Sequence, residues 1–483
     1  MNIDKLLNKY KSLPVQVKAS FWFLICSFFQ KGISMITTPI FTRLLSTTEY
    51  GQYNVFNSWL GIVTILVSLN LYAGVHAQGL IKYNTERPEF TSSLQGLTTL
   101  LVFGWTVIYI IFRGFWNNLL SLTTVQMLAM LVMIWATAVF GFWANEQRVV
   151  YSYKTLVIVT LIISIMKPGL GIVLVRKAQD KVTARILGLM IVELVGYSWM
   201  YIYQVRRGKT FFSKKFWLYA LGFNLPLVPH YLSQTVLNNA DRIMIKTMVG
   251  YSESGIYSLA YSLSQIMMLF NTALSQTISP WMYQKIKENK GKEIAPVAYV
   301  TLVIIAIVNL FLILLAPEAV AIFAPKSYYD AIWVIPPVAL SVYFMYSYDL
   351  FAKFAFYHEK TKFIMEASVA GAALNVILNY ICIKKFGYVA AGYTTLACYM
   401  IYSVVHYHFM KRVCDQFCGG VYPYDTSKIL LITIPFVAVG LALLFTYRYP
   451  FVRYGIFVVS LIVTVIRRKK ILSIVTRLIN LKK

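Results

Sequence analysis

Long apolar runs constrain the fold of this chain more than any other feature. A helix needs roughly 20 apolar residues to cross the hydrocarbon core of a bilayer. The runs are continuous instead of alternating in polarity, which favours helices over a β-barrel. They lie at about residues 17–40, 53–76, 92–113, 118–143, 153–175, 183–204, 217–240, 256–279, 296–322, 331–352, 363–383, 388–409, 428–447 and 451–466. The sequence predicts an all-α polytopic membrane protein with about 14 transmembrane helices, the last of them short.

The composition excludes several other classes of protein. Hydrophobic residues make up 58% of the chain and charged residues 13%, whereas soluble proteins carry about 25% charged residues. A soluble enzyme, a disordered chain and a disulfide scaffold are therefore excluded. The five cysteines form no CxxC pair, so we expect free thiols and no metal site.

The basic residues predict an orientation in the membrane. The chain has 45 Lys and Arg against 18 Asp and Glu, an excess that would indicate nucleic acid only in a soluble protein. Placing the N-terminus inside puts most Lys and Arg in inner loops, which predicts a multi-pass membrane protein with both termini in the cytoplasm. The loop with Arg176, Lys177, Lys181 and Arg185 opposes this rule. The first residues do not resemble a cleaved signal peptide, and the basic tail at 467–470 suits anionic lipid.

An internal repeat divides the predicted helices. The pattern E-x-G-x-Y occurs at Glu49 to Tyr53 and again at Glu253 to Tyr257. The two copies lie 204 residues apart. This offset predicts two pseudo-symmetric bundles of six helices in one orientation, related by an axis along the membrane normal. We expect an N-terminal lobe at 1–209, a C-terminal lobe at 210–412, and two additional helices with a basic tail at 413–483.

Matching polar stripes follow the first and the seventh helix. The seventh carries Asn224, Tyr231, Gln234, Asn238 and Asp241 on one face at helical spacing. The repeat aligns them with Ser20, Ser27, Gln30, Ser34 and Thr37 of the first helix. We interpret the stripes as the lining of a shared central cavity; the alternative is that they hold helices together within lipid.

Charged residues inside predicted helices are the strongest candidates for function, because each costs about 2.5–3.5 kcal/mol to insert. Lys31 lies on the polar stripe and could bind an anion or pair with Glu193. Lys167 precedes Pro168 and Gly169, where we expect a broken helix that suits a phosphate; a kinked helix with a snorkelling lysine is the alternative.

The remaining candidates have narrower interpretations. Asp349 and Lys353 are four residues apart and are expected to pair. Glu366 is expected in the solvated headgroup region, and His230 is a weaker candidate for a proton relay. Pro39, Pro226 and Pro229 are expected to interrupt the first and seventh helices, as alternating access requires. No nucleotide-binding or catalytic motif is present in the sequence, so a transporter is favoured over an enzyme.

Several segments resemble one known family. TPIFTRLLSTTEYGQY (Thr38 to Tyr53), LPLVPH (Leu225 to His230), NNADR (Asn238 to Arg242) and ESGIY (Glu253 to Tyr257) are similar to signatures of the polysaccharide-repeat-unit flippases, the Wzx type. Further similar segments are YHEKTK (Tyr357 to Lys362), LNVILNYI (Leu374 to Ile381) and KKFGYVAAG (Lys384 to Gly392). The family belongs to the superfamily of multidrug, oligosaccharidyl-lipid and polysaccharide exporters.

The resemblance implies a function and a set of partners. It implies transfer of an oligosaccharide on undecaprenyl diphosphate from the cytoplasmic to the outer leaflet by alternating access, for capsule, O-antigen, exopolysaccharide or teichoic-acid assembly. We expect a monomer in contact with membrane lipids and with polysaccharide polymerases and glycosyltransferases, but not with nucleic acid. No cofactor is expected, and H⁺ or Na⁺ is the candidate coupling ion.

The candidate residues sort by role. Substrate contacts are expected from Lys31, Arg43, Lys167, Arg242, Gln30, Ser34, Gln234 and Asn238; an ion pair of Arg242 with Asp241 is the rival interpretation. Coupling is expected from Asp241 and Glu193, and hinges from Pro39, Pro168, Gly169, Pro226 and Pro229. A cation-coupled multidrug exporter of the same superfamily, and a membrane polymerase or scaffold, are the two alternatives. An exporter of cations would favour carboxylates in the cavity, and a polymerase would favour a large outer loop.

Overall fold

The computed structural model describes residues 14–466 and residue 468. Apart from Arg468, the predicted basic tail lies outside these residues, as do the first residues of the chain. The chain forms two compact units, residues 1–243 and 244–483. The lobe boundaries predicted at 209 and 412 are boundaries of the sequence repeat, not of these compact units, and they stay a prediction.

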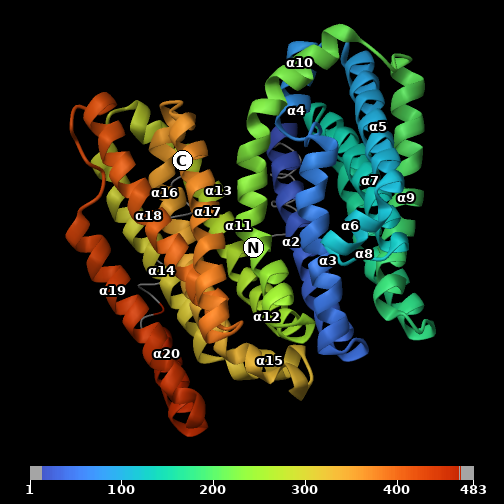
Figure 1. The fold of residues 1–483 in the computed structure, drawn as a ribbon. Helices are drawn as coiled ribbons and strands as arrows, with labels where there is room; N and C mark the ends of the chain where they lie inside the picture. The colour runs from blue at the N-terminus through green and yellow to red at the C-terminus, as the bar shows by residue number, and fades with distance from the viewer. Residues whose placement is uncertain (1–13, 467, 469–483) are drawn as a thin grey trace, which may run out of the picture. The chain divides into compact units, whose positions relative to one another are not determined.

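The first unit is entirely helical in the described residues, and its helices are drawn from blue to green in Figure 1. In chain order they are α2 (Val15–Leu44), α3 (Thr47–Ser68), α4 (Gly74–Lys82), α5 (Arg87–Ile111), α6 (Arg113–Leu120), α7 (Thr124–Val149), α8 (Tyr153–Lys177), α9 (Lys181–Gly208), α10 (Lys214–Asn224), the 3₁₀ turn η1 (Leu225–Leu227) and α11 (Val228–Met248), which reaches the second unit.

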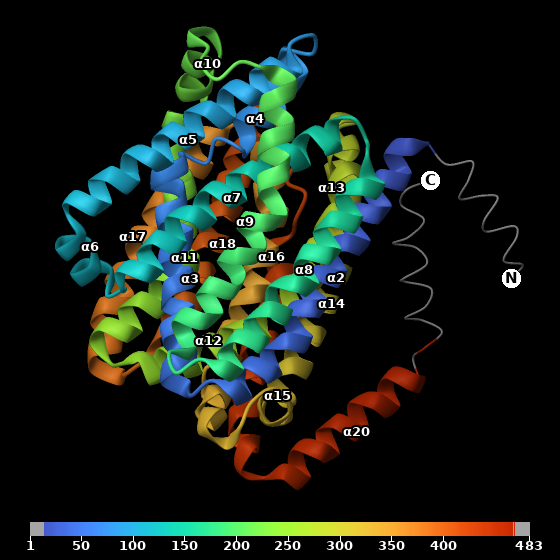
Figure 2. The same ribbon diagram turned by 90° about the vertical axis from the view of Figure 1, so that its right-hand side faces the viewer.

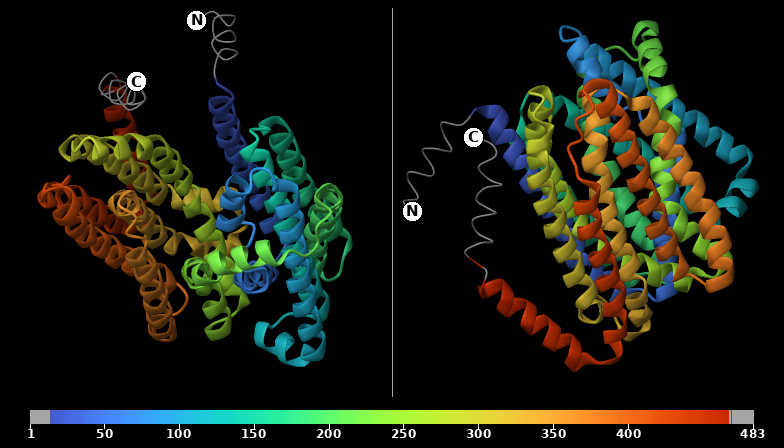
Figure 3. Two further views of the ribbon diagram at one scale, coloured as in Figure 1. Left: turned by 90° about the horizontal axis from the view of Figure 1, so that it is seen from above. Right: turned by 90° about the vertical axis from the view of Figure 1, so that its left-hand side faces the viewer.

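The second unit is built around one buried helix. Its elements are α12 (Tyr251–Gln265), α13 (Met267–Lys287), η2 (Gly291–Glu293), α14 (Ile294–Leu314), α15 (Ala316–Phe323), η3 (Lys326–Trp333), α16 (Ile335–Tyr357), α17 (Thr361–Phe386), α18 (Ala390–Phe417), α19 (Thr426–Ala442), η4 (Leu443–Arg448) and α20 (Pro450–Ile466). Most of α16 is buried, with α12, α13, α14 and α18 packed along it. Figure 3 shows α20 leading away from these helices. Most of its side chains are exposed, Phe451 by 91%, whereas Arg453 is buried.

The predicted transmembrane segments all coincide with helices or helix pairs. Within the described residues, eight helices are long and apolar enough to cross a membrane, and the pair η3 and α16, bent by 48°, would make nine. The other predicted segments fall on α3 with α4, α10 with α11, α12 with α13, α18 and α20, which are broken, less apolar or short. The chain is thus a multi-pass membrane protein, and the exposed apolar side chains are those that lipid would cover.

The repeat is visible in the element boundaries. Helix α2 ends at Leu44 and α11 at Met248, and α3 begins at Thr47 and α12 at Tyr251, so both pairs differ by 204 residues. The shared glutamate has a local reason: the Glu49 side chain accepts from the Ser46 backbone N–H, which closes a capping box at the start of α3. Glu253 lies in the corresponding first turn of α12.

Prolines act differently from the prediction in two of the three helices. Helix α2 runs unbroken through Pro39 and α8 through Pro168, so the expected interruption of the first helix and the expected break beside Lys167 are both wrong. A single proline removes one donor, and a helix can absorb that loss by bending. Pro226 and Pro229 remove two donors within one turn, and the chain there tightens into η1, which confirms the predicted interruption of the seventh helix.

Small residues let α8 and α9 approach closely, and Figure 2 shows the two helices side by side. A Cβ atom on Gly188 of α9 would lie 3.0 Å from the Cα atom of Gly171 on α8. Small residues at such a crossing are the usual way for membrane helices to pack. This contact places the pocket-lining residues of α8 and α9 on neighbouring surfaces.

We predict that Gly188→Ala destabilises the first unit by about 1–3 kcal/mol, because the added methyl group meets backbone that cannot move aside. Thermal unfolding of the detergent-solubilised chain measures the effect as a lowered midpoint. Gly104→Ala is the matched control, because a Cβ atom there meets nothing within 4 Å. Equal midpoints for the two variants would contradict the close packing of α8 and α9.

Candidate functional site

A polar pocket of about 280 Å³ opens within the first unit. Four helices form it: α2, α3, α8 and α9. The lining side chains include two cations and no carboxylate. The lining residues are Gln30, Ile33, Ser34, Thr37, Phe41, Tyr53, Ser164, Lys167, Pro168, Gly171, Arg185 and Leu189.

The polar stripe of α2 forms one wall of this pocket. Gln30, Ser34, Thr37 and Phe41 follow one another at spacings of four, three and four residues, which keeps them on one helix face. The Gln30 Nε2 atom donates to the Ser164 Oγ atom of α8 at 3.3 Å. Three stripe residues, Gln30, Ser34 and Thr37, therefore line a pocket of the first unit. The cavity shared with the seventh helix and the roles of Gln30 and Ser34 as substrate contacts stay predictions.

Lys167 is held at the pocket by an ion pair. Its Nζ atom lies 2.6 Å from the Oε1 atom of Glu193 on α9, and the ring centroid of Tyr197 lies 5.8 Å from it. The Glu193 side chain is 7% exposed and that of Lys167 28%. Lys167 thus reaches the pocket while Glu193 stays behind it. The alternative in which Glu193 pairs with Lys31 is wrong, because Lys167 occupies that carboxylate.

Arg185 is a lining residue that the sequence did not single out as a site. Its guanidinium carbon lies 3.7 Å from the ring centroid of Phe41 and 3.4 Å from that of Tyr53. Stacking between two rings restricts the orientation of the guanidinium plane. The only sequence signal was the excess of cations in this predicted outer loop. Lys181 is likewise held, by the carbonyl of Leu44 at 3.2 Å.

The other predicted cations of the first unit lie outside the pocket lining. Lys31 is exposed and makes no hydrogen bond or ion pair with the part of the chain that the structure describes. Arg43 is exposed, and its Nη1 atom donates to the Pro39 carbonyl at 2.9 Å. Their roles as substrate contacts stay predictions.

The end of α11 carries four of the predicted residues. The Arg242 Nη1 atom donates to the Asn238 carbonyl at 3.1 Å and to the Asn239 Oδ1 atom at 3.3 Å. Asp241 is 1% exposed, whereas Asn238 is exposed and Gln234 half-buried. His230 is also half-buried, near the start of α11. None of these residues lines the pocket of the first unit.

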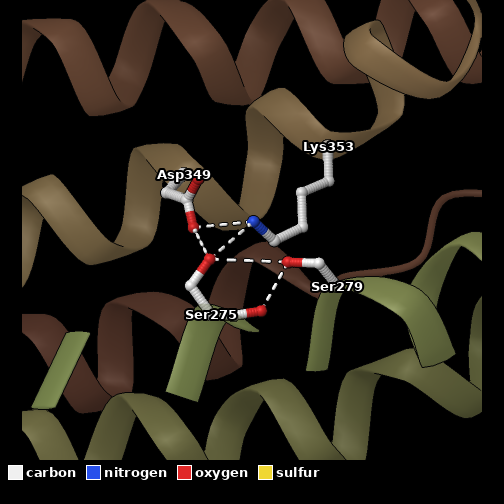
Figure 4. A network of polar contacts seen from close by, with 4 residues as sticks. All are labelled: Ser275, Ser279, Asp349 and Lys353. Carbon is white, nitrogen blue, oxygen red and sulfur yellow. Dashed lines mark hydrogen bonds and ion pairs between the residues drawn. The ribbon is translucent and has the colours of Figure 1, made fainter. Parts of the chain in front are cut away.

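The second unit contains the predicted pair of Asp349 and Lys353, which is confirmed. The Lys353 Nζ atom donates to the Asp349 Oδ2 atom at 2.7 Å and to the Ser275 Oγ atom at 3.0 Å. Figure 4 shows the lysine reaching across to Asp349 and to Ser275 of α13. The Ser275 hydroxyl donates to Asp349 at 2.7 Å, so the network joins α13 to α16. Glu366 is exposed on α17, and its place in the headgroup region stays a prediction.

Sequence comparisons place the chain in a family. Residues 17–286, more than half of the chain, match the model of the family described as polysaccharide biosynthesis protein, and residues 226–381 match the MatE model. The Lsg locus putative protein 1 of Haemophilus influenzae is 23% identical over 389 residues, which cover 74% of this chain and 89% of that protein. The probable low-salt glycan biosynthesis flippase Agl15 of Haloferax volcanii is 23% identical over 413 residues, which cover 82% and 83%.

Solved structures share the fold. The lipid II flippase MurJ in an inward closed conformation matches with a TM-score of 0.68 at 14% identity, over 92% of this chain and 99% of that one. An inward-facing multidrug resistance MATE family transporter matches with a TM-score of 0.60 at 12% identity, over 80% and 95%.

The chain therefore belongs to the polysaccharide biosynthesis protein family, and the resemblance to the polysaccharide flippases of the exporter superfamily is confirmed. Agl15 and MurJ are named as flippases and the MATE protein as a transporter, which supports a transporter and not an enzyme.

We predict that Lys167→Met destabilises the first unit by about 3 kcal/mol, because it leaves the buried Glu193 carboxylate without its cation. The double variant Lys167→Met with Glu193→Leu should regain most of this loss, since both charges are removed together. Thermal unfolding of the two variants beside the unmodified chain tests the pair. A double variant no more stable than the single one would contradict it.

Proposed function

We propose that the chain is a flippase that moves a polyprenyl-diphosphate-linked oligosaccharide from the cytoplasmic to the outer leaflet of a bacterial cell membrane, with both of its termini in the cytoplasm. The observation that carries the proposal is the charge of the pocket. Lys167 and Arg185 line it, and no carboxylate does. Charge-assisted hydrogen bonds from lysine and arginine are the strongest contacts that a protein offers to a phosphate.

The size of the pocket indicates which part of the substrate it holds. At about 280 Å³ it lies just below the range of roughly 300–1,000 Å³ that is typical of small-molecule sites. It suits a diphosphate but not a whole oligosaccharide, so the glycan extends beyond it. The amide of Gln30 and the hydroxyls of Ser34 and Ser164 would meet the first sugar or the phosphate oxygens. The prenyl chain stays in lipid.

The two cations have different parts in this proposal. Arg185 is stacked and pre-oriented, so binding costs it little conformational entropy. Lys167 is shared with Glu193, and its ammonium group has three donors, so a phosphate can bind on the pocket side while the ion pair persists. Lys31, Arg43 and Arg242 remain proposed contacts for the substrate on its way to or from the pocket.

The proposal includes transport by alternating access, and the candidate hinges belong to it. The interruption at Pro226 and Pro229 lies between α10 and α11 and gives the seventh helix a place to bend. Pro39, Pro168 and Gly169 lie inside continuous helices and would permit bending without a break. Asp241 and Glu193 remain the proposed carboxylates for coupling to H⁺ or Na⁺.

A multidrug exporter is the second candidate, because residues 226–381 match the MatE model. Exporters of organic cations need accessible carboxylates, and the pocket of the first unit exposes cations instead. Deleting the gene in its host tests both candidates. A flippase deletion removes one surface polymer and leaves its lipid-linked precursor inside the cell, while an exporter deletion sensitises the cell to cationic dyes. Dye sensitivity with the polymers unchanged would contradict our proposal.

We predict that Arg185→Gln lowers delivery of the lipid-linked glycan to the outer leaflet by about 10- to 100-fold. A hydrogen bond to a charged group contributes about 1.5–3 kcal/mol, and the variant removes the charge but keeps a polar side chain. Restoration of the surface polymer in the deletion strain measures delivery. Lys177→Gln is the matched control, because Lys177 is an exposed cation at the end of α8 that does not line the pocket. Equal delivery by both variants at equal expression would contradict a role for Arg185.

A further inference from the structure

A chain of buried hydrogen bonds crosses four helices of the first unit, away from the pocket. The Thr91 hydroxyl of α5 lies 3.0 Å from the His76 Nε2 atom of α4 and donates to the Glu146 Oε1 atom of α7 at 3.1 Å. The Gln204 Nε2 atom of α9 donates to the Glu146 Oε2 atom at 2.7 Å. The Gln95 Nε2 atom of α5 donates to Gln204 at 2.7 Å. Figure 1 shows these four helices within the first unit.

The members of this chain are removed from water. His76, Thr91 and Gln95 are 0% exposed, Gln204 is 2% exposed and Glu146 is 8% exposed. Both carboxylate oxygens of Glu146 accept from neutral donors, and within the described residues no Lys or Arg lies at ion-pair distance from it. A buried carboxylate without a cation is costly when ionised, and a bound proton removes that cost.

Other ionisable groups face Glu146 at longer range. Arg87 on α5 and Arg207 on α9 act on its carboxylate through space, and His76 on α4 reaches it through Thr91. On α7 itself, the Arg148 Nη1 atom is bonded to the Asn145 Oδ1 atom at 3.1 Å. Helices α3, α6 and α8 also pack against α7, but in the described part of the chain they bring no ionisable group to this carboxylate.

The contacts of His76 define its tautomer. Thr91 donates to Glu146, so its hydroxyl oxygen accepts from His76, which places a hydrogen on Nε2. The Nδ1 atom faces the amide nitrogen of Asn145 at 3.5 Å and accepts from it. In this arrangement the imidazole is neutral and Glu146 is the acceptor at the end of the hydrogen-bond chain.

We propose that His76, Thr91 and Glu146 form a proton-binding site of this carrier. With a neutral imidazole and an ionised Glu146 the three residues carry one negative charge, and binding of one proton makes them neutral. A proton that arrives at the His76 Nδ1 atom displaces the Nε2 hydrogen to the Thr91 oxygen, and the Thr91 hydrogen passes to Glu146. The imidazole then stays neutral with its hydrogen on Nδ1, and Glu146 is protonated. The ligand of this site is H⁺, and the site is separate from the pocket that contains Lys167.

Proton binding has a structural consequence at the break between α3 and α4. The Asn145 Nδ2 atom that faces His76 also donates to the Tyr72 carbonyl at 2.6 Å. Tyr72 lies in the segment that joins the two helices, where Leu69 and Asn70 have φ angles of 49° and 53°. A proton on His76 Nδ1 would oppose two donors, so Asn145 would have to turn and release Tyr72. Proton binding at His76 and Glu146 is thereby linked to the backbone conformation of the segment between α3 and α4.

Infrared difference spectroscopy of the full chain in liposomes tests the proposal without any substrate. The unmodified chain should show a protonated carboxyl band that disappears as the pH is raised. Glu146→Gln should remove this band. Glu86→Gln is the matched control and should keep it, because Glu86 is an exposed carboxylate of the same unit, paired with Lys215 at 2.6 Å.

A second variant keeps the test decisive if Glu146→Gln does not fold. Thr91→Val preserves both ionisable groups and removes one donor to the ionised carboxylate. The band should then persist to higher pH by about one to two pH units. A spectrum with no titrating carboxyl band, or a titration that neither variant alters, would overturn the proposal. Because no substrate is present, that failure would leave the proposed flippase function untouched.

Discussion

The structure depends on one constraint: inside a bilayer no water is available to satisfy a polar group, so each must find its partner within the protein. Most polar groups here obey it in ordinary ways. Serine and threonine hydroxyls donate to carbonyls one turn back, as Ser58 does to Asn54 and Ser68 to Thr64. The ionisable side chains are stabilised in different ways: Lys167 by an ion pair, Arg185 by aromatic stacking and Glu146 by neutral hydrogen-bond donors.

These three kinds of stabilising contact have different consequences for function. An ion pair completed inside the protein, as with Lys353 and Asp349, is an adequate structural contact and needs no ligand. Lys167 and Arg185 line a pocket whose lining includes no carboxylate, and we propose that an anion from outside the chain binds there. Within the described residues Glu146 has no cation at bonding distance, and we propose that a proton binds there.

The sequence predicted the helices well, because a span leaves a long apolar run that needs no tertiary information. It also predicted the α2 wall of the pocket, since helical spacing alone brings Gln30, Ser34 and Thr37 to one face. Arg185 was counted as a loop charge, because three cations precede it and nothing in the sequence reveals that Phe41 and Tyr53 enclose it. The Glu146 network was invisible for the same reason, since its partners lie 55 to 58 residues away along the chain.

The central claim is that the pocket of the first unit holds the phosphorylated head group. A cryo-electron microscopy structure of the full chain with a polyprenyl-diphosphate-linked oligosaccharide tests it most directly. We expect phosphate density within hydrogen-bond distance of the Lys167 ammonium and the Arg185 guanidinium, with the first sugar against the α2 wall. Phosphate density elsewhere in the chain, with this pocket left to lipid or solvent, would contradict it.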